Sequence, residues 1–193
     1  MKRLPMTPSQ TIGPFFRLAL ERPEWSDLAR SGARGEAIAV EGRVLDGDGA
    51  PVDDALLETW QANAEGNYDH PEDAQAGKTD PAFRGFGRAL TDAQGRYRFT
   101  TVRPGRVAGP GGALQAPHLE VAIFARGLLK RLVTRVYFEG DPANEADPVL
   151  GSIAEPSLRR TLIAARERSA GGPVTYRFDI VLQGEGETAF FDL

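Results

Sequence analysis

Side chains able to bind a metal or move a proton are scarce in this sequence. The chain has two histidines, His70 and His118, and no cysteine. The absence of cysteine excludes disulfides, thiolate zinc sites, iron–sulfur clusters and cysteine nucleophiles. Any metal site must therefore use histidine, tyrosine and carboxylate ligands. The tyrosines are Tyr68, Tyr97, Tyr137 and Tyr176.

The segment His118-Leu119-Glu120 brings two such groups together. Residues two apart in a strand project from the same face, so we expect His118 and Glu120 side by side. Tyr68 and His70 are candidates to complete a metal cluster around them. The reading that we favour is that an arginine neutralises Glu120, so that this chain alone binds no metal. The candidates for that arginine are Arg103 and Arg106.

The elements that must position these residues are short strands, because apolar and polar residues alternate between turn signals. We expect an all-β fold, an antiparallel β-sandwich with an extended N-terminal arm and short peripheral helices. The chain is expected to form one domain over 1–193, with the arm at 1–20 and the sandwich core at 37–184. Strands are predicted at 37–44, 55–60, 87–91, 96–100, 118–124, 132–138 and 176–182, helices at 23–32 and 156–168, and long loops at 61–86 and 103–117.

The arm is predicted from Pro8, Gly13 and Pro14, which exclude a helix over this stretch. Phe15 and Phe16 follow directly and need a surface to cover them. We therefore expect the arm to pack on another body.

Charge and hydropathy exclude two classes of partner. The 193 residues include 23 basic and 27 acidic side chains, a formal charge of −4, which argues against nucleic acid. No apolar run approaches the roughly 20 residues of a membrane-spanning helix, and the first residues lack the apolar core of a signal peptide. We expect a cytoplasmic protein that binds neither nucleic acid nor membrane.

Several motifs follow one another in a specific order over nearly the whole chain. They are Thr7-Pro8-Ser9-Gln10-Thr11-Ile12-Gly13-Pro14, Trp60-Gln61-Ala62-Asn63-Ala64-Glu65-Gly66-Asn67-Tyr68, Ala116-Pro117-His118, Arg135-Val136-Tyr137-Phe138-Glu139-Gly140-Asp141-Pro142 and Tyr176-Arg177-Phe178-Asp179-Ile180. Together they resemble the intradiol ring-cleaving dioxygenases, in particular the protocatechuate 3,4-dioxygenases. Each motif alone is a weak signal, and their order makes the resemblance specific.

That resemblance implies a ferric, non-haem iron held by two tyrosinates and two histidines. Tyr68 matches the first tyrosinate and His118 the first histidine. Glu120 stands in the place of the second histidine, and the loop that should carry the second tyrosine has Val107. An arginine implied just before the histidine pair is replaced by Gln115.

Two of four ligands are therefore missing, and the resemblance implies the iron-free α chain of an enzyme with two homologous chains. The β chain would hold the Fe(III), in a hetero-oligomer of αβ units. We expect no catalytic residue in this chain alone. The cluster near Tyr68, His118 and Glu120 would be a vestigial metal site.

The resemblance further implies that Thr11, Pro14 and Arg135 contribute to the substrate pocket. A guanidinium such as that of Arg135 can hold a carboxylate on the substrate ring. From the residues alone, the favoured interpretation of Arg135 is an ordinary strand arginine paired with Glu139 or Asp141, and only the resemblance reverses that preference.

The activity implied is cleavage of 3,4-dihydroxybenzoate by O₂ to 3-carboxy-cis,cis-muconate, a step of aromatic catabolism in the β-ketoadipate pathway. Two alternatives stay open. One is an iron-binding, homo-oligomeric intradiol dioxygenase acting on catechol or hydroxyquinol. The other is a non-enzymatic β-sandwich binding module of the transthyretin-like kind.

Overall fold

The computed structural model describes residues 6–13, 15–73, 79–167 and 172–192. Its main sheet is built from nine strands within this part of the chain. They are β1 (Ala37–Leu45), β2 (Leu56–Trp60), β3 (Phe86–Leu90), β4 (Arg96–Val102), β7 (His118–Phe124), β8 (Leu132–Phe138), β9 (Ile163–Glu167), β10 (Val174–Arg177) and β11 (Ile180–Val181).

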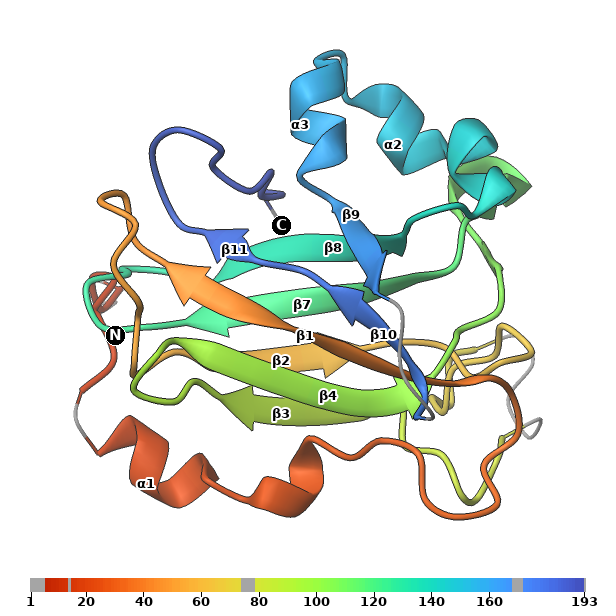
Figure 1. The fold of residues 1–193 in the computed structure, drawn as a ribbon, viewed down its shortest axis with the longest axis horizontal. Coiled ribbons are helices and arrows are strands. Elements are labelled where there is room, and N and C mark those ends of the chain that lie inside the picture. Colours follow the sequence, from red (N-terminus) through yellow and green to blue (C-terminus); the bar gives the residue numbers. More distant parts are fainter. Residues whose placement is uncertain (1–5, 14, 74–78, 168–171, 193) are drawn as a thin grey trace, which may run out of the picture.

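This sheet folds over on itself to make a sandwich (Figure 1). Its order is β11-β1-β10-β9-β8-β7-β2-β3, and β4 also pairs with β1. Strand β9 joins the two halves, because its start pairs with β8 and its end with β10. The predicted β-sandwich is therefore confirmed, as one continuous sheet whose halves face each other.

Short elements surround the sandwich, as expected from the sequence (Figure 1). No helix in the described ranges is long and apolar enough to cross a membrane. The small elements are α1 (Phe16–Leu20), η1 (Pro23–Trp25), β5 (Val107–Ala108), η2 (Pro110–Gly112), β6 (Leu114–Gln115), η3 (Pro142–Ala146), α2 (Pro148–Ser152) and α3 (Pro156–Arg160).

The alternating residues of the strands form the main core between the two halves. In β4, Tyr97 and Phe99 are buried while Arg96 and Arg98 are exposed, which is the period of two that the sequence shows. A separate, smaller cluster lies near α2 and is made of Ala116, Tyr137, Leu150 and Leu162. The second cluster is what holds η3 and α2 against the end of β8.

Not every strand pair is antiparallel. Strand β1 pairs in parallel with β10 and β11, and β8 pairs in parallel with β9. Parallel neighbours need a crossover connection, and η3, α2 and α3 supply one between β8 and β9. The sheet is therefore mixed, but most of its strand pairs are antiparallel, in keeping with the predicted antiparallel sandwich.

The predicted helix over 156–168 is only half correct. Residues Pro156–Arg160 form α3, but Ile163–Glu167 form β9. Ala164, fully buried, pairs with Phe138 of β8. Strand pairing over the core therefore overrides local helix preference.

The predicted helix over 23–32 is also wrong beyond its first turn, η1. Leu28 is fully buried, and its N–H donates to the Thr100 carbonyl oxygen at 2.8 Å. Its own carbonyl oxygen accepts from the Arg84 N–H at 2.8 Å. The chain here runs extended because its backbone pairs with β4 on one side and with residues 82–84, which precede β3, on the other.

The described part of the arm, residues 6–13, contains no helix or strand, and a helix begins only at Phe16. The Phe16 ring lies 5.8 Å from the ring of Phe124 at the end of β7. Phe15 remains 78% exposed.

Candidate functional site

Strand register brings most of the predicted site residues together at one end of the β2–β7–β8 half of the sheet. His118 lies opposite Tyr137, and Glu120 lies opposite Arg135. On its other side, Glu120 faces Trp60 of β2. Directly opposite residues have Cβ atoms about 4.5–5.5 Å apart, so these side chains form one group, called the site group below. Their face is turned away from the main core, to which Leu119 and Val136 belong.

His118 is a buried, neutral imidazole. Its side chain is 6% exposed, and its Nδ1 lies 2.8 Å from the Ala116 carbonyl oxygen. Burial lowers the pKa of His118 to about 4, the Ala116 hydrogen bond opposes that shift, and the Arg135 guanidinium adds to it. His118 is therefore uncharged near neutral pH, and its bond to Ala116 fixes the ring.

Tyr68 stands at the rim of the same group. Its ring stacks on Trp60, with centroids 5.9 Å apart and planes within 2° of parallel. Its backbone N–H donates to Asp73 Oδ2 at 2.6 Å, which holds the loop that carries it. Burial raises the pKa of Tyr68, while Arg135 lowers it and Glu120 raises it. The phenol thus remains protonated at neutral pH.

Arg135 carries the positive charge of the group. Its Nη1 donates to Gln115 Oε1 at 2.6 Å and lies 3.4 Å from the Tyr137 hydroxyl. The Phe191 ring centroid is 5.9 Å from the guanidinium carbon. Neither expected carboxylate pairs with it: Asp141 binds Arg103, and Glu139 accepts a bond from the Arg166 N–H.

A buried carboxylate, Asp147, holds the Tyr137 side of the group in place through its hydrogen bonds. It is 2% exposed and accepts from the N–H groups of Ala116, Val149 and Leu150 at 2.7–2.9 Å. The Tyr137 hydroxyl donates to Asp147 Oδ1 at 3.2 Å. Burial raises the pKa of Tyr137 to about 12, so this hydroxyl keeps its proton. Asp147 thereby connects α2, β8 and the segment leading into β7.

The arginines expected to neutralise Glu120 lie elsewhere. Arg103 binds Asp141 at 2.8 Å and the Tyr176 hydroxyl at 2.6 Å. Arg106 donates to the carbonyl oxygens of Leu114 and Gln115. The cross-strand neighbour of Glu120 is instead Arg135, which the sequence could not reveal without the register.

The residues of this group do not fit a ferric ion. Ferric iron favours anionic oxygen ligands, and of the positions that the resemblance implies as ligands Val107 offers no ligand atom and Glu120 replaces a histidine. The Arg135 guanidinium supplies a competing positive charge within electrostatic reach of Tyr68 and His118. His70, proposed as a fourth member, is exposed and accepts a bond from the Glu72 N–H. No group of three or more His, Asp or Glu side chains suited to a metal occurs among the described residues.

The arm residues do not join this group within one chain. Thr11 is exposed, and its hydroxyl accepts from the Gly127 N–H at 2.7 Å, in the turn between β7 and β8. Arg135 lies toward the other end of that hairpin. Pro14 lies outside the described residues.

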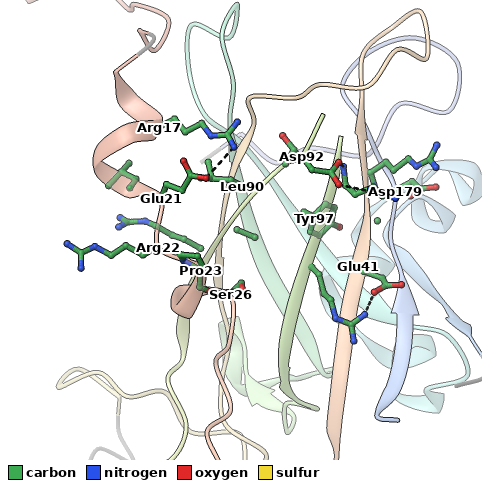
Figure 2. A pocket seen from close by; sticks show the side chains of 18 of the residues that line it. Arg17, Glu21, Arg22, Pro23, Ser26, Glu41, Leu90, Asp92, Tyr97 and Asp179 are labelled. Carbon is green, nitrogen blue, oxygen red and sulfur yellow. Dashed lines mark hydrogen bonds and ion pairs between the residues drawn. The ribbon is translucent and has the colours of Figure 1, made fainter. Parts of the chain in front are cut away.

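The part of the surface that the structure describes has a smaller and a larger hollow. The smaller, about 480 Å³, borders the site group and is lined by Trp60, Tyr68, His70, Glu72 and Asp73. The larger, about 630 Å³, lies between α1 and the outer side of β1, β3 and β4, as Figure 2 shows. Most arginines of the larger hollow form ion pairs with carboxylates that line it too. The pairs are Arg17 with Glu21, Arg96 with Asp92, Arg98 with Glu41 and Arg177 with Asp179. Of the side chains described above, Tyr68 and its stacking partner Trp60 line the smaller hollow.

Comparison with known proteins gives the family. A family model described as Dioxygenase matches residues 19–184. The protocatechuate 3,4-dioxygenase alpha chain of Pseudomonas putida is 44% identical over 201 residues, covering 98% of this chain and 97% of that one. The protocatechuate 3,4-dioxygenase beta chain of Burkholderia cepacia is 42% identical over 160 residues, covering 80% of this chain and 67% of that one.

A solved structure gives the same result. The dioxygenase domain of a dioxygenase carbohydrate-binding protein fusion from Streptomyces sp. SirexAA-E is 30% identical, with a TM-score of 0.62 over 95% of this chain and 99% of that chain. The alpha-chain match spans the full length of both proteins, whereas the beta-chain match does not. The chain therefore belongs to the intradiol dioxygenase family, with a protocatechuate 3,4-dioxygenase alpha chain as a full-length relative.

Proposed function

We propose that this chain is the alpha subunit of a two-chain enzyme that cleaves protocatechuate with O₂ to 3-carboxy-cis,cis-muconate. The full-length similarity to an alpha chain supports this role, and the similarity to a beta chain supports a homologous partner. The whole chain would act as one domain whose N-terminal arm reaches the partner. We also propose a cytoplasmic location, which the absence of cysteine fits, because disulfides are typical of oxidising compartments.

The residues of the site group are the observation that supports separate roles for the alpha and beta chains. Val107 and Glu120 stand where the resemblance implies iron ligands, and a guanidinium lies beside the remaining Tyr68. We therefore assign the Fe(III) to the beta chain. The alpha chain would contribute to the wall of the substrate pocket.

Arg135 is the residue that we assign to the substrate carboxylate. It is half-buried, and it takes part in none of the ion pairs formed by the described residues. A guanidinium that makes no ion pair is suited to an anionic ligand, because its hydrogen-bond donors can still form charge-assisted bonds, even with Glu120 opposite it in the strand register. The contributions of Thr11 and Pro14 are proposed from the resemblance, and Thr11 is exposed on the surface of this chain.

Purification of this chain alone, of the beta chain alone and of the co-expressed pair tests the proposal. We expect the chain alone to contain no stoichiometric iron and to consume no protocatechuate. The pair should contain iron, show the tyrosinate-to-iron absorption band and consume O₂ with protocatechuate. Stoichiometric iron with that band in this chain alone would contradict the assignment and favour a self-sufficient intradiol enzyme.

A further inference from the structure

The hydrogen-bond acceptors of the Arg135 guanidinium are electrically neutral, and the Glu120 carboxylate, its cross-strand neighbour, forms no ion pair with it among the described residues. Gln115 Oε1 accepts from Nη1 at 2.6 Å, and the Tyr137 hydroxyl lies 3.4 Å from the same nitrogen. Nε and Nη2 make no hydrogen bond to another described residue. The short contact to an amide therefore orients the guanidinium without adding a negative charge beside it, and Nε and Nη2 keep their hydrogen-bonding capacity.

Gln115 is itself held on several sides. It is 6% exposed, and its Nε2 donates to the Ala108 carbonyl oxygen at 3.4 Å. A Cβ on Gly109 would lie 2.9 Å from its Cγ, so the side chain fills the space that this glycine leaves. The next residue, Ala116, donates its N–H to the buried Asp147 at 2.7 Å. Gln115 thus has little freedom to turn away from Arg135.

We propose that Gln115 is a positioning residue that orients the Arg135 guanidinium and, because it is neutral, reserves the charge for a carboxylate on the substrate ring. The inference rests on the proposed function, since it concerns how Arg135 acts there. It makes Gln115 a determinant of preference for carboxylated over uncarboxylated catechols. The Tyr137 hydroxyl, which donates to Asp147, is the second and more distant hydrogen-bond acceptor of the Arg135 guanidinium.

The physical reason is a competition between two carboxylates. A glutamate at position 115 would place an anion within hydrogen-bond distance of Nη1, in a half-buried setting where charge pairs are strong. The substrate carboxylate would then have to displace it or bind a neutralised cation. An apolar residue of similar size would leave the charge of the guanidinium unchanged but would remove the hydrogen bond that orients it.

The test measures KM and kcat for protocatechuate in the co-expressed complex for Gln115→Glu and Gln115→Met. We expect Gln115→Glu to raise KM by roughly 10- to 100-fold, the range of a lost charge-assisted contact, with kcat little changed. For Gln115→Met we expect an increase of about 2- to 10-fold. Binding of catechol, which lacks the carboxylate, should change less than 2-fold by the same reasoning, and the iron content should stay constant.

A second arginine–glutamine pair supplies the matched control. Gln94 accepts from Arg96 Nη2 at 3.0 Å in the exposed β3–β4 turn, away from Arg135. Gln94→Glu makes the same chemical change, and KM should not move. If Gln115→Glu behaves like Gln94→Glu while Arg135→Ala raises KM, the positioning role is wrong and the proposed function stands.

Two further outcomes are also decisive. If Arg135→Ala leaves KM unchanged, the assignment of Arg135 to the substrate fails, and the role of Gln115 fails with it. If Gln115→Glu prevents assembly with the beta chain, Gln115→Met decides: an unchanged KM for protocatechuate overturns the proposal, and a raised KM with unchanged binding of catechol supports it.

Discussion

The side chains of the site group differ in what they can do because their partners differ. Arg135 has only neutral hydrogen-bond acceptors, whereas Arg103 is already bound to Asp141. We expect Arg135→Ala in the co-expressed complex to lower kcat/KM for protocatechuate by roughly 10- to 150-fold, because a charge-assisted contact is lost. The loss should lie mainly in KM, since the contact is made in both ground and transition states. Bleaching of the iron colour in this variant, or turnover equal to that of the parent, would show that Arg135 does not contact the substrate.

His118 gives a prediction about pH. Its pKa is about 4 in the folded chain, below the ordinary 6.5. Between these two values the unfolded chain binds a proton at His118 and the folded chain does not. The free energy of unfolding therefore decreases as the pH falls from 6.5, the pKa in the unfolded chain, toward 4, the pKa in the folded chain. Between about pH 7 and about pH 5 we expect a loss of about 2 kcal/mol from this group, measured by urea unfolding. His118→Gln, which cannot titrate, should remove that part of the pH dependence. An equal slope in parent and variant would rule out the buried, neutral imidazole.

The site residues divide according to how far apart in the sequence their partners lie. Tyr68, His118 and Glu120 were identifiable because the motifs around them are local. The contact of Arg135 with Gln115 was not, because it depends on β6 and β8 meeting beside β7. Asp147 gave no signal of its own, since its burial follows from the placement of α2 over the second core.

The elements show the same division between local and distant causes. Alternation of apolar and polar residues placed β1, β2, β4, β7 and β8 within one or two residues of their observed ends. It failed for β9 and for the segment around Leu28, where pairing with distant strands decides the conformation. The strand predicted over 176–182 is split at Phe178, where the chain passes from β10 to β11.

That split explains why residue 42 is glycine. Both β10 and β11 pair with β1, and the Phe178 backbone crosses directly over Gly42. A Cβ at this position would collide with the Phe178 carbonyl oxygen. We expect Gly42→Ala to lower the free energy of unfolding by about 3 kcal/mol, the upper end for overpacking. Gly151→Ala, in α2 with nothing within 4 Å of the added Cβ, should be neutral or raise it by up to about 1 kcal/mol. Equal denaturation midpoints for the two variants would contradict this account of the β10–β11 break.

The molecule as a whole combines a fully packed sandwich with an apolar N-terminal surface that the chain itself leaves open. Met6, Phe15 and Leu18 are 93%, 78% and 69% exposed, whereas the ring of Phe16 packs on Phe124. Scattered exposed apolar residues are ordinary, but three within thirteen positions beside α1 are typical of a surface that a partner covers. The expected packing of the arm on another body is consistent with this exposure, and it remains a prediction.

Phe15→Ser combined with Leu18→Ser tests it. If the beta chain covers this surface, each buried side chain contributes roughly 1.5–3 kcal/mol, so the dissociation constant of the pair should rise by about 100-fold or more. The isolated chain should unfold at the same denaturant concentration as the parent, because exposed substitutions cost at most about 0.5 kcal/mol. Leu158→Ser, in α3 and 40% exposed, is the control and should bind the beta chain normally. Unchanged affinity of the double variant, measured by sedimentation or titration against the beta chain, would mean that the arm covers only its own sandwich.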